Sequence, residues 1–443
     1  MGHRHRPHRH RRRCASHEQG HPRRPRQRSR RPRRGRPHPL RRQHETRQRR
    51  RTPRPSRRRW WPDWRCEPRG GRTPRHHRGR ESGRVMNDAH AHRLVRVRHA
   101  MQERELDALL VTLPANVRWL SGFTSPEDAR VLVTPEDAWL LTDGRYIAQA
   151  DAESHLPAVI ERDWMRIAAE RAKDGQVGVE AEHVTLATGT KLEHHFGRDP
   201  IRTEGLIARL RRTKDDAESD AIRRAAALTD RAYEHALGMV RPGVRELDVA
   251  LEIERFVRSE GGDGMAFDVI VASGPRSAMP HGLASSKVIE AGELLTIDMG
   301  ARVDGYCADM TRTVGVGPVS DAHRALFDAV LEAQVASLAA VAPGKPTRDV
   351  DAVARDILTR HGLGEAFAHS LGHGVGLEIH EAPGLAPRSE DVLEAGMAVT
   401  IEPGAYHPGD AGVRIEDLAL VTEDGHEVLS HAPKGWRTVG VDA

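Results

Sequence analysis

Hydrophobic positions follow two periods from residue 88 onward, so both helices and strands are expected. Short apolar runs between turn-forming residues indicate strands, and apolar residues three or four positions apart indicate helices. The first region predicts helices at 88–106 and 145–153, a turn at Asp143-Gly144, and a further helix before its last strand. Its predicted strands are Ala108–Thr112, Val117–Gly122, Val131–Val133, Ala138–Leu141, Ala158–Ile160 and Val177–Val179. Alternating strands and helices predict an α/β domain.

A polar segment at 203–216 follows, and we expect a domain boundary there. Beyond it, two blocks repeat the same order of elements: helix, helix, strand and hairpin. The first block has a long helix to about 239, a helix at roughly 245–260 and a strand at Ala266–Ala272. The second has helices at 321–341 and 347–361, with a histidine-containing stretch, Phe367–Leu377, in place of the strand. This pattern predicts an internal duplication and an α+β fold.

Each block ends in a hairpin that carries two carboxylates. In the first, Leu294–Asp298 and Cys307–Thr311 are strands, and symmetric pairing about residues 303–304 places Asp298 opposite Asp309. Like charges that face each other destabilise a sheet. In an otherwise apolar strand pair, a bound cation is the simplest explanation for them.

The second hairpin repeats this arrangement, because pairing centred on Gly409 places Glu402 opposite Glu416. Between the two hairpins lie His369, His373 and His380, in a segment whose glycines allow close approach to a ligand. Four carboxylates and one imidazole carry too much negative charge for one divalent ion, so two bridged ions are expected. An oxygen-rich set with one nitrogen favours Mn²⁺, with Co²⁺ or Zn²⁺ as alternatives.

The formal net charge of +7 averages two unlike segments. Residues 1–85 hold 32 arginines, no lysine and 5 acidic residues, whereas the remainder holds 38 basic and 58 acidic residues. Segment 1–85 has almost no aliphatic residues, so we expect it to be disordered. One interpretation is a basic arm that binds nucleic acid or an anionic surface. The other, which the absence of lysine favours, is a mis-assigned start, with translation beginning at Met86 or nearby.

Cysteine spacing and hydropathy indicate the cellular compartment in which the protein is expected. Cys14, Cys66 and Cys307 show no paired or metal-ligand spacing, which fits a reducing compartment such as the cytoplasm. No apolar run is long enough to predict a transmembrane helix, and no apolar stretch follows the basic N-terminus as in a secretory signal.

These residues resemble the creatinase, aminopeptidase P and prolidase family of M24 metallopeptidases, which have a pita-bread fold. The resemblance covers about 88–443 and implies a creatinase-like N-terminal domain at 86–210 and a catalytic domain at 211–443. The matching motifs are Ser273–His281, Ile297–Gly300, Asp309–Thr313, His369–Gly376, His380-Glu381, Thr400–Gly404 and Val413–Asp417.

The resemblance also implies the roles of site residues. The metal ligands would be Asp298, Asp309, His373, Glu402 and Glu416, with Asp309 and Glu416 as bridging ligands. The pocket histidines would be His281, His369 and His380, and Arg414 would support the ligands. Hydroxide between the metals would attack the carbonyl before proline, and Glu402 would carry a proton to the leaving nitrogen. Short proline-containing peptides would be the substrates, and a homodimer is expected.

Several functions remain open within this resemblance. An Xaa-Pro dipeptidase and an Xaa-Pro aminopeptidase are the main alternatives, and no residue in the sequence separates them. The additional domain argues against methionine aminopeptidase, and the complete ligand set argues against creatinase. An aminopeptidase of different specificity and a non-catalytic peptide-binding module are the remaining alternatives.

Overall fold

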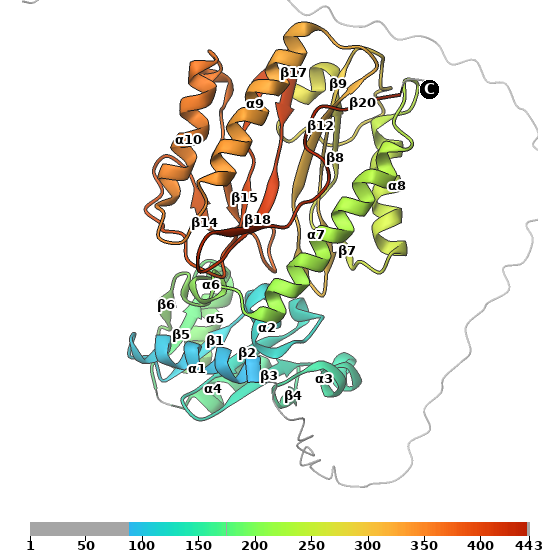
Figure 1. The fold of residues 1–443 in the computed structure, drawn as a ribbon. Coiled ribbons are helices and arrows are strands. Elements are labelled where there is room, and N and C mark those ends of the chain that lie inside the picture. The colour runs from blue at the N-terminus through green and yellow to red at the C-terminus, as the bar shows by residue number, and fades with distance from the viewer. Residues whose placement is uncertain (1–87, 174, 441–443) are drawn as a thin grey trace, which may run out of the picture. The chain divides into compact units, whose positions relative to one another are not determined.

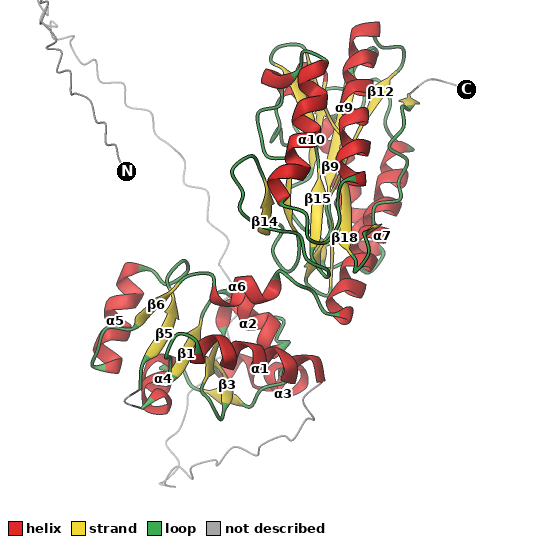
Figure 2. Ribbon diagram, turned by 60° about the vertical axis from the view of Figure 1, so that its left-hand side comes forward, coloured by secondary structure: helices red, strands yellow, loops and turns green. Residues whose placement is uncertain are grey.

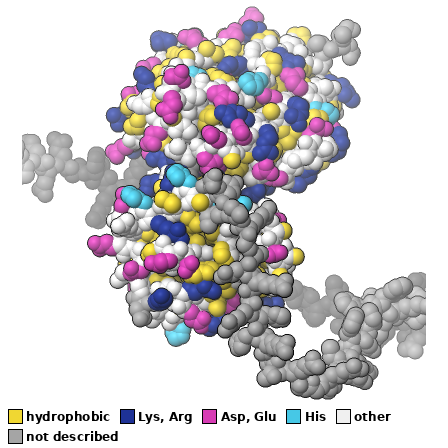
Figure 3. Space-filling view, turned by 60° about the horizontal axis from the view of Figure 1, so that its bottom comes forward, with side chains coloured by type: hydrophobic (Ala, Val, Ile, Leu, Met, Phe, Trp, Pro, Cys, Tyr) yellow, Lys and Arg dark blue, Asp and Glu magenta, His cyan; other side chains and the backbone are white. Residues whose placement is uncertain are grey.

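The computed structural model describes residues 88–173 and 175–440 (Figure 1). The predictions for segment 1–85 therefore lie outside the described residues. Among the helices of these residues, none combines the length and the apolar composition of a transmembrane span. On the described part of the face shown in Figure 3, basic and acidic side chains are interspersed, and neither sign covers it.

The first domain is built on a six-stranded mixed sheet. The order is β4-β3-β2-β1-β5-β6, with β1 antiparallel to β2 and parallel to β5. Helices cover both faces, because alternate residues of β1 enter two different cores. The elements are α1 (Asp88–Gln102), β1 (Ala108–Val111), α2 (Pro114–Ser121), β2 (Arg130–Val133), β3 (Ala138–Thr142), α3 (Ile147–Glu153), β4 (Ala158–Ile160), α4 (Trp164–Ala172), β5 (Val177–Glu180), α5 (Leu186–Phe196) and β6 (Ile201–Thr203).

The predicted strand Val117–Gly122 is wrong, because this segment belongs to α2. Pro114 occupies the first turn, where its missing N–H costs nothing. Gly122 ends the helix in the left-handed conformation, with φ of 75°, and its N–H donates to the carbonyl of Arg118. A short apolar run fits a strand or a buried helix equally well, and here these two end residues decide the outcome.

The second domain begins after the short helix α6 (Leu206–Arg211) and consists of two similar halves (Figures 1 and 2). In the first half, two helices share a core with the sheet β20-β12-β9-β8. Its elements are α7 (Asp216–Leu237), α8 (Glu246–Ser259), β7 (Gly264–Met265), β8 (Ile270–Ser273), β9 (Leu294–Met299), β10 (Ala301–Val303), β11 (Tyr306–Cys307) and β12 (Met310–Val316), with β20 (Thr438–Val439) at the edge.

The second half repeats this plan with two helices and the sheet β14-β13-β15-β18-β19. Isolated bridges just before α8 and at the start of α10, Arg245 with Val288 and Pro346 with Val392, occur at matching places in the two halves. The predicted duplication is therefore confirmed. The elements are α9 (Asp321–Ala339), α10 (Thr347–Arg360), β13 (Gly372–Gly374), β14 (Glu381–Leu385), β15 (Ala398–Ile401), β16 (Gly404–His407), β17 (Ala411–Arg414), β18 (Asp417–Val421) and β19 (His426–Val428).

The expected strand Ala266–Ala272 is confirmed only in its second half, where β8 begins at Ile270, and the separate strand β7 ends just before it at Met265. β7 pairs with β10, whereas β8 pairs with β9 in a different sheet. The chain changes sheets between them, and Phe267 and Asp268 in this connection line a cavity described below.

The register of the first hairpin differs from the prediction by two residues. Asp298 pairs with Thr311, so Asp309 lies diagonally from Asp298 on the same face. The cause is the turn, where Asp304 and Gly305 both have positive φ, 50° and 82°. Two such residues favour a tight two-residue loop. The hairpin is therefore centred between Asp304 and Gly305, one residue later than the predicted centre between residues 303 and 304.

In the second hairpin the predicted register holds in the paired strands. Ile401 pairs with Asp417 in one ladder, and Gly404 pairs with Arg414 in the next. Glu402 and Glu416 lie between these two ladders, where the same register sets them opposite each other.

Gly300 lies where the first hairpin leaves no room for a side chain. A Cβ atom there would come within 1.8 Å of the carbonyl oxygen of Ala308. We expect Gly300→Ala to reduce the free energy of unfolding by at least about 3 kcal/mol, because backbone has to move. Gly425→Ala is the control, since its Cβ would have open space and change stability by less than about 0.5 kcal/mol. Denaturant unfolding measures both, and equal effects would contradict the steric argument.

Candidate active site

A cavity of about 470 Å³ opens between the two halves of the second domain. Side chains from both hairpins and from the histidine segment reach it, and apolar residues such as Phe267, Ile270 and Leu283 complete its wall. The structure thus brings all nine sequence-predicted site residues together. These are His281, Asp298, Asp309, His369, His373, His380, Glu402, Arg414 and Glu416.

The centre of the cavity has the donor atoms of a metal site. Asp309, His373 and Glu416 each offer one atom, and these atoms lie within 4.8 Å of one another. His373 Nε2 lies 3.3 Å from Glu402 Oε1 and 3.6 Å from Asp309 Oδ2. Its Nδ1 lies 3.0 Å from the carbonyl of Gly374, to which it donates, so Nε2 keeps its lone pair for a cation.

Two buried carboxylate oxygens in this cluster have no hydrogen-bond partner. They are Oδ1 of Asp298 and Oε1 of Glu416. The other oxygens of the same groups are occupied, by Arg414 at 2.6 Å and by the Thr311 hydroxyl at 2.8 Å. Buried polar atoms normally have partners, so two free oxygens beside an open imidazole nitrogen fit a bound divalent cation.

The electrostatics of the cluster point the same way. Burial, and then the charges of neighbouring carboxylates, raise the pKa of Asp309 and of Glu416 well above the usual range. Burial also favours protonation of Glu402, but contacts with His373 and Arg414 outweigh it and lower its pKa. Without a cation, the cluster therefore holds protons that a metal would displace.

Arg414 is buried and holds several elements of the site together. It donates to Asp298 Oδ2, to the Thr311 hydroxyl and to the carbonyl of Pro280, the last two at 3.0 Å. Its Nη1 also lies 3.0 Å from the Tyr406 hydroxyl. One guanidinium thus fixes a candidate ligand and the backbone beside His281.

The three other histidines line the cavity around this cluster. His369 Nδ1 lies 2.8 Å from the carbonyl of Ser370, and its Nε2 lies 2.9 Å from the Tyr406 hydroxyl. The rings of His380 and His373 are 4.4 Å apart. Burial lowers the pKa of His369 and of His380, and the neighbouring His373 lowers that of His380 further. His281 is exposed at the cavity wall.

Sequence reasoning missed Tyr406, and it gave no role to Thr311 and Thr400 although both lie in matching motifs. Thr400 donates to Glu402 Oε1 at 3.1 Å, and Thr311 connects Arg414 to Glu416. These three residues lie in buried strands, where an isolated hydroxyl carries no recognisable spacing signal.

We expect Tyr406→Phe to lower kcat about 10-fold or more, because His369 loses the hydroxyl that orients its ring. The ring itself remains, so the free energy of unfolding should change by less than about 1.5 kcal/mol. Steady-state kinetics measure the change in kcat, and thermal unfolding measures the change in stability. Unchanged kcat would mean that Tyr406 only fills space.

Comparison with known proteins agrees with this geometry. The family model for metallopeptidase family M24 matches residues 220–423, and the model for the creatinase/prolidase N-terminal domain matches residues 93–213. An Xaa-Pro dipeptidase of Pyrococcus furiosus is 37% identical over 338 residues, which cover 76% of this chain and 97% of that protein.

Solved structures are also similar. The Xaa-Pro dipeptidase from Bacillus anthracis is 42% identical with a TM-score of 0.77, covering 79% of this chain and all of that one. An X-Pro aminopeptidase from Thermotoga maritima is 35% identical with a TM-score of 0.72, covering 77% of this chain and all of that one. These similarities confirm the predicted α+β architecture, in which a creatinase-type domain precedes a pita-bread domain.

Proposed function

This chain belongs to metallopeptidase family M24, and from that premise we propose that it is a metal-dependent exopeptidase for Xaa-Pro bonds. Its substrates are dipeptides or short peptides with proline in the second position. The observation that carries this proposal is the cluster of carboxylates around His373, with two buried oxygens that lack partners.

Five side chains would hold the metal, namely Asp298, Asp309, His373, Glu402 and Glu416. The set is rich in oxygen, has one nitrogen and contains no thiolate, which favours two Mn²⁺ ions over a structural zinc. When bound, such ions supply Lewis acidity and make a water acidic enough to attack near neutral pH.

The remaining chemistry belongs to the side chains of the cavity. Glu402, with its lowered pKa, is ionised and is the group that takes a proton from the attacking water and passes it to the leaving nitrogen. His380 or His281 would donate a hydrogen bond to the carbonyl oxygen of the bond that is cleaved. Arg414 and Tyr406 keep the cluster and His369 in place.

Proline at the second position is part of the proposal for two reasons. The relatives named above are Xaa-Pro dipeptidases and an X-Pro aminopeptidase. The imide nitrogen of proline also has no N–H, so a site that selects Xaa-Pro bonds relies on shape, and apolar residues such as Ile270 and Leu283 wall this cavity. We also propose a cytoplasmic homodimer, as the cysteine spacing and the family resemblance suggest.

The test is product release by the purified full chain with added Mn²⁺, using Ala-Pro, Ala-Pro-Ala and Ala-Ala. Preference for Ala-Pro makes the protein a dipeptidase, and preference for Ala-Pro-Ala makes it an aminopeptidase. Cleavage of Ala-Ala at an equal rate contradicts the proline specificity. Metal analysis on the same sample should give two Mn²⁺ per chain. No cleavage with two metals bound would leave a peptide-binding module as the function.

A further inference from the structure

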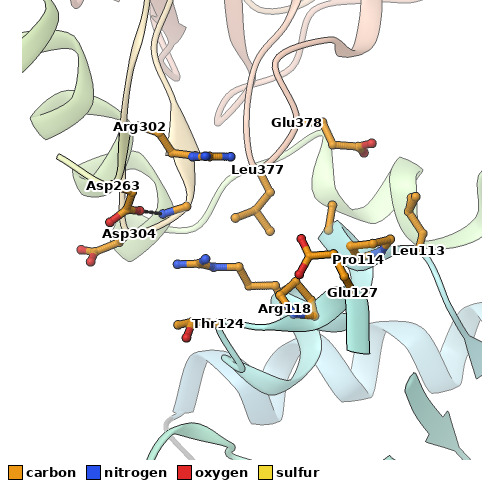
Figure 4. A pocket seen from close by; sticks show the side chains of 13 residues that line it. Leu113, Pro114, Arg118, Thr124, Glu127, Asp263, Arg302, Asp304, Leu377 and Glu378 are labelled. Carbon is orange, nitrogen blue, oxygen red and sulfur yellow. Dashed lines mark hydrogen bonds between the residues drawn. The ribbon is translucent and has the colours of Figure 1, made fainter. Parts of the chain in front are cut away.

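The segment that carries His380 separates two cavities. Ile379 and His380 line the catalytic cavity, whereas Leu377 and Glu378 line a second cavity of about 650 Å³. Figure 4 shows Leu377 pointing into this second cavity, toward Arg118 of α2 and with Arg302 of β10 nearby. Leu377 and Ile379 pack against neighbouring cores but are only partly buried, since cavities lie on both sides, so further contacts are needed to hold segment 376–381 in position.

Glu381 anchors this segment at its end. Its side chain is only 6% exposed. Arg211 Nη2 donates to Glu381 Oε1, and Lys214 Nζ donates to Glu381 Oε2 at 3.2 Å. The backbone N–H of Glu378 also donates to Glu381 Oε1, at 3.1 Å. The carboxylate therefore also binds the backbone of its own segment.

The glycine that begins the segment fits against the same carboxylate. A Cβ atom at Gly376 would come within 2.6 Å of the Glu381 oxygens. The N–H of Gly376 donates to the carbonyl of Glu378, and its own carbonyl accepts from Cys307. The conformation between Gly376 and Glu381 therefore depends on where the Glu381 carboxylate is held.

Arg211 connects this anchor to the first domain. Its side chain is 2% exposed, and besides Glu381 it donates to Glu378 Oε2 at 3.0 Å and to Asn116 Oδ1 at 2.7 Å. Asn116 in turn donates to Glu180 Oε1 at 2.5 Å. The polar segment before α7, expected to be only a boundary, thus contributes two buried cations that reach the catalytic domain.

We propose that Arg211 and Lys214 are positioning residues that hold Glu381 and thereby fix His380 in the catalytic cavity. The first domain and the segment that joins it to the second then take part in catalysis through contacts, without touching the substrate. This inference rests on the proposed function for its kinetic consequences. A guanidinium suits this role, because its several N–H groups donate to three acceptors at once.

The experiment compares Glu381→Gln with a matched control, Glu218→Gln. Glutamine keeps the shape of Glu381, but its NH₂ group faces a cationic donor, so one anchor contact is lost. Glu218 is likewise buried between the domains, where it contacts Arg93, Trp119 and Tyr306, but it does not touch segment 376–381. Arg211→Lys is a second variant, which keeps the positive charge but lacks the guanidinium group that reaches several acceptors at once.

For Glu381→Gln we expect kcat to fall about 10- to 100-fold, with KM and metal content changing less than about threefold. Hydrogen exchange should speed up in segment 376–381. In a His380→Ala background the effect of Glu381→Gln on kcat should largely disappear, because both changes act through the same imidazole. Glu218→Gln should leave kcat and exchange in this segment unchanged, whatever its effect on Tm.

Multiplicative losses in the double variant, or an equal fall of kcat in Glu218→Gln, would overturn the proposal. If Glu381→Gln fails to fold, Arg211→Lys gives the same comparison. If the wild type cleaves no Xaa-Pro peptide, the proposed function fails, and hydrogen exchange still decides whether Glu381 holds the segment. Unchanged exchange in both variants would then refute the anchor itself.

Discussion

Asp309→Asn is expected to abolish activity and, at the same time, to stabilise the metal-free protein. Asp309 is buried among Asp298, Glu402 and Glu416, and its pKa is raised well above the usual range by burial and then by Glu416. Asparagine keeps the shape of the side chain but is neutral at every pH, so folding no longer has to protonate this carboxyl group or bury its charge beside the other carboxylates. Removal of that cost should raise the free energy of unfolding without metal by about 1–2 kcal/mol.

The loss of activity follows from the same change. An amide oxygen carries no charge and is a weaker ligand for a divalent cation than a carboxylate, so the cluster would hold metal less tightly. Lewis acidity of bound metal contributes several kcal/mol to the transition state, and each 1.4 kcal/mol is about tenfold in rate. We therefore expect kcat/KM on an Xaa-Pro peptide to fall at least about 10³-fold, together with loss of stoichiometric Mn²⁺.

The measurements are steady-state kinetics, metal analysis, and denaturant unfolding in EDTA and in Mn²⁺. Asp268→Asn is the matched control, because Asp268 lines the same cavity but lies outside the carboxylate cluster. Its activity and stability should stay close to those of the wild type. An Asp309→Asn protein that is less stable than the wild type in EDTA would show that the cluster is not under electrostatic strain.

The candidate site could be predicted from the sequence because its parts are local. Each carboxylate lies at the end of an apolar strand, and the histidines and glycines lie within one segment. Asp309 shows the limit of this reasoning. The residue that pairs with Asp309 depends on the length of the hairpin loop. The Asp304-Gly305 pair is a strong signal for a two-residue turn, and it predicts the observed register better than symmetry about residues 303–304 does.

The parts that could not be predicted depend on partners far away in the sequence. Arg211 and Lys214 have the composition of a solvated boundary, yet both are buried because Glu381 lies against them, about 170 residues later. Tyr406 resembles an ordinary strand residue until Arg414 and His369 converge on its hydroxyl. Long-range ion pairs and isolated hydroxyls leave no periodic pattern.

The pH dependence of stability should have opposite signs without and with metal. In the metal-free protein, the pKa values of Asp309 and Glu416 lie well above those of unfolded carboxyl groups, about 4. Above about pH 4, the folded state therefore binds more protons than the unfolded state. Stability then falls as pH rises from about 4 through the raised pKa values. The raised pKa of His373, where burial is outweighed by Glu402, acts in the same direction above its usual value of 6.5.

With metal we expect the reverse dependence, because a divalent cation held by these groups would bind the deprotonated carboxylates and the neutral imidazole. Its affinity increases with pH, and a ligand at about 1,000 times its Kd adds about 4 kcal/mol to the free energy of unfolding. We expect Tm in EDTA to be higher at pH 5.5 than at pH 8, and Tm in saturating Mn²⁺ to be higher at pH 8. Glu416→Gln should flatten both trends, since it removes one titrating group and one ligand. A Tm in EDTA that rises with pH would contradict this prediction, because it would mean that the carboxylates are ionised without a cation. The unpartnered oxygens of Asp298 and Glu416 would then be hydrogen-bonded to buried water.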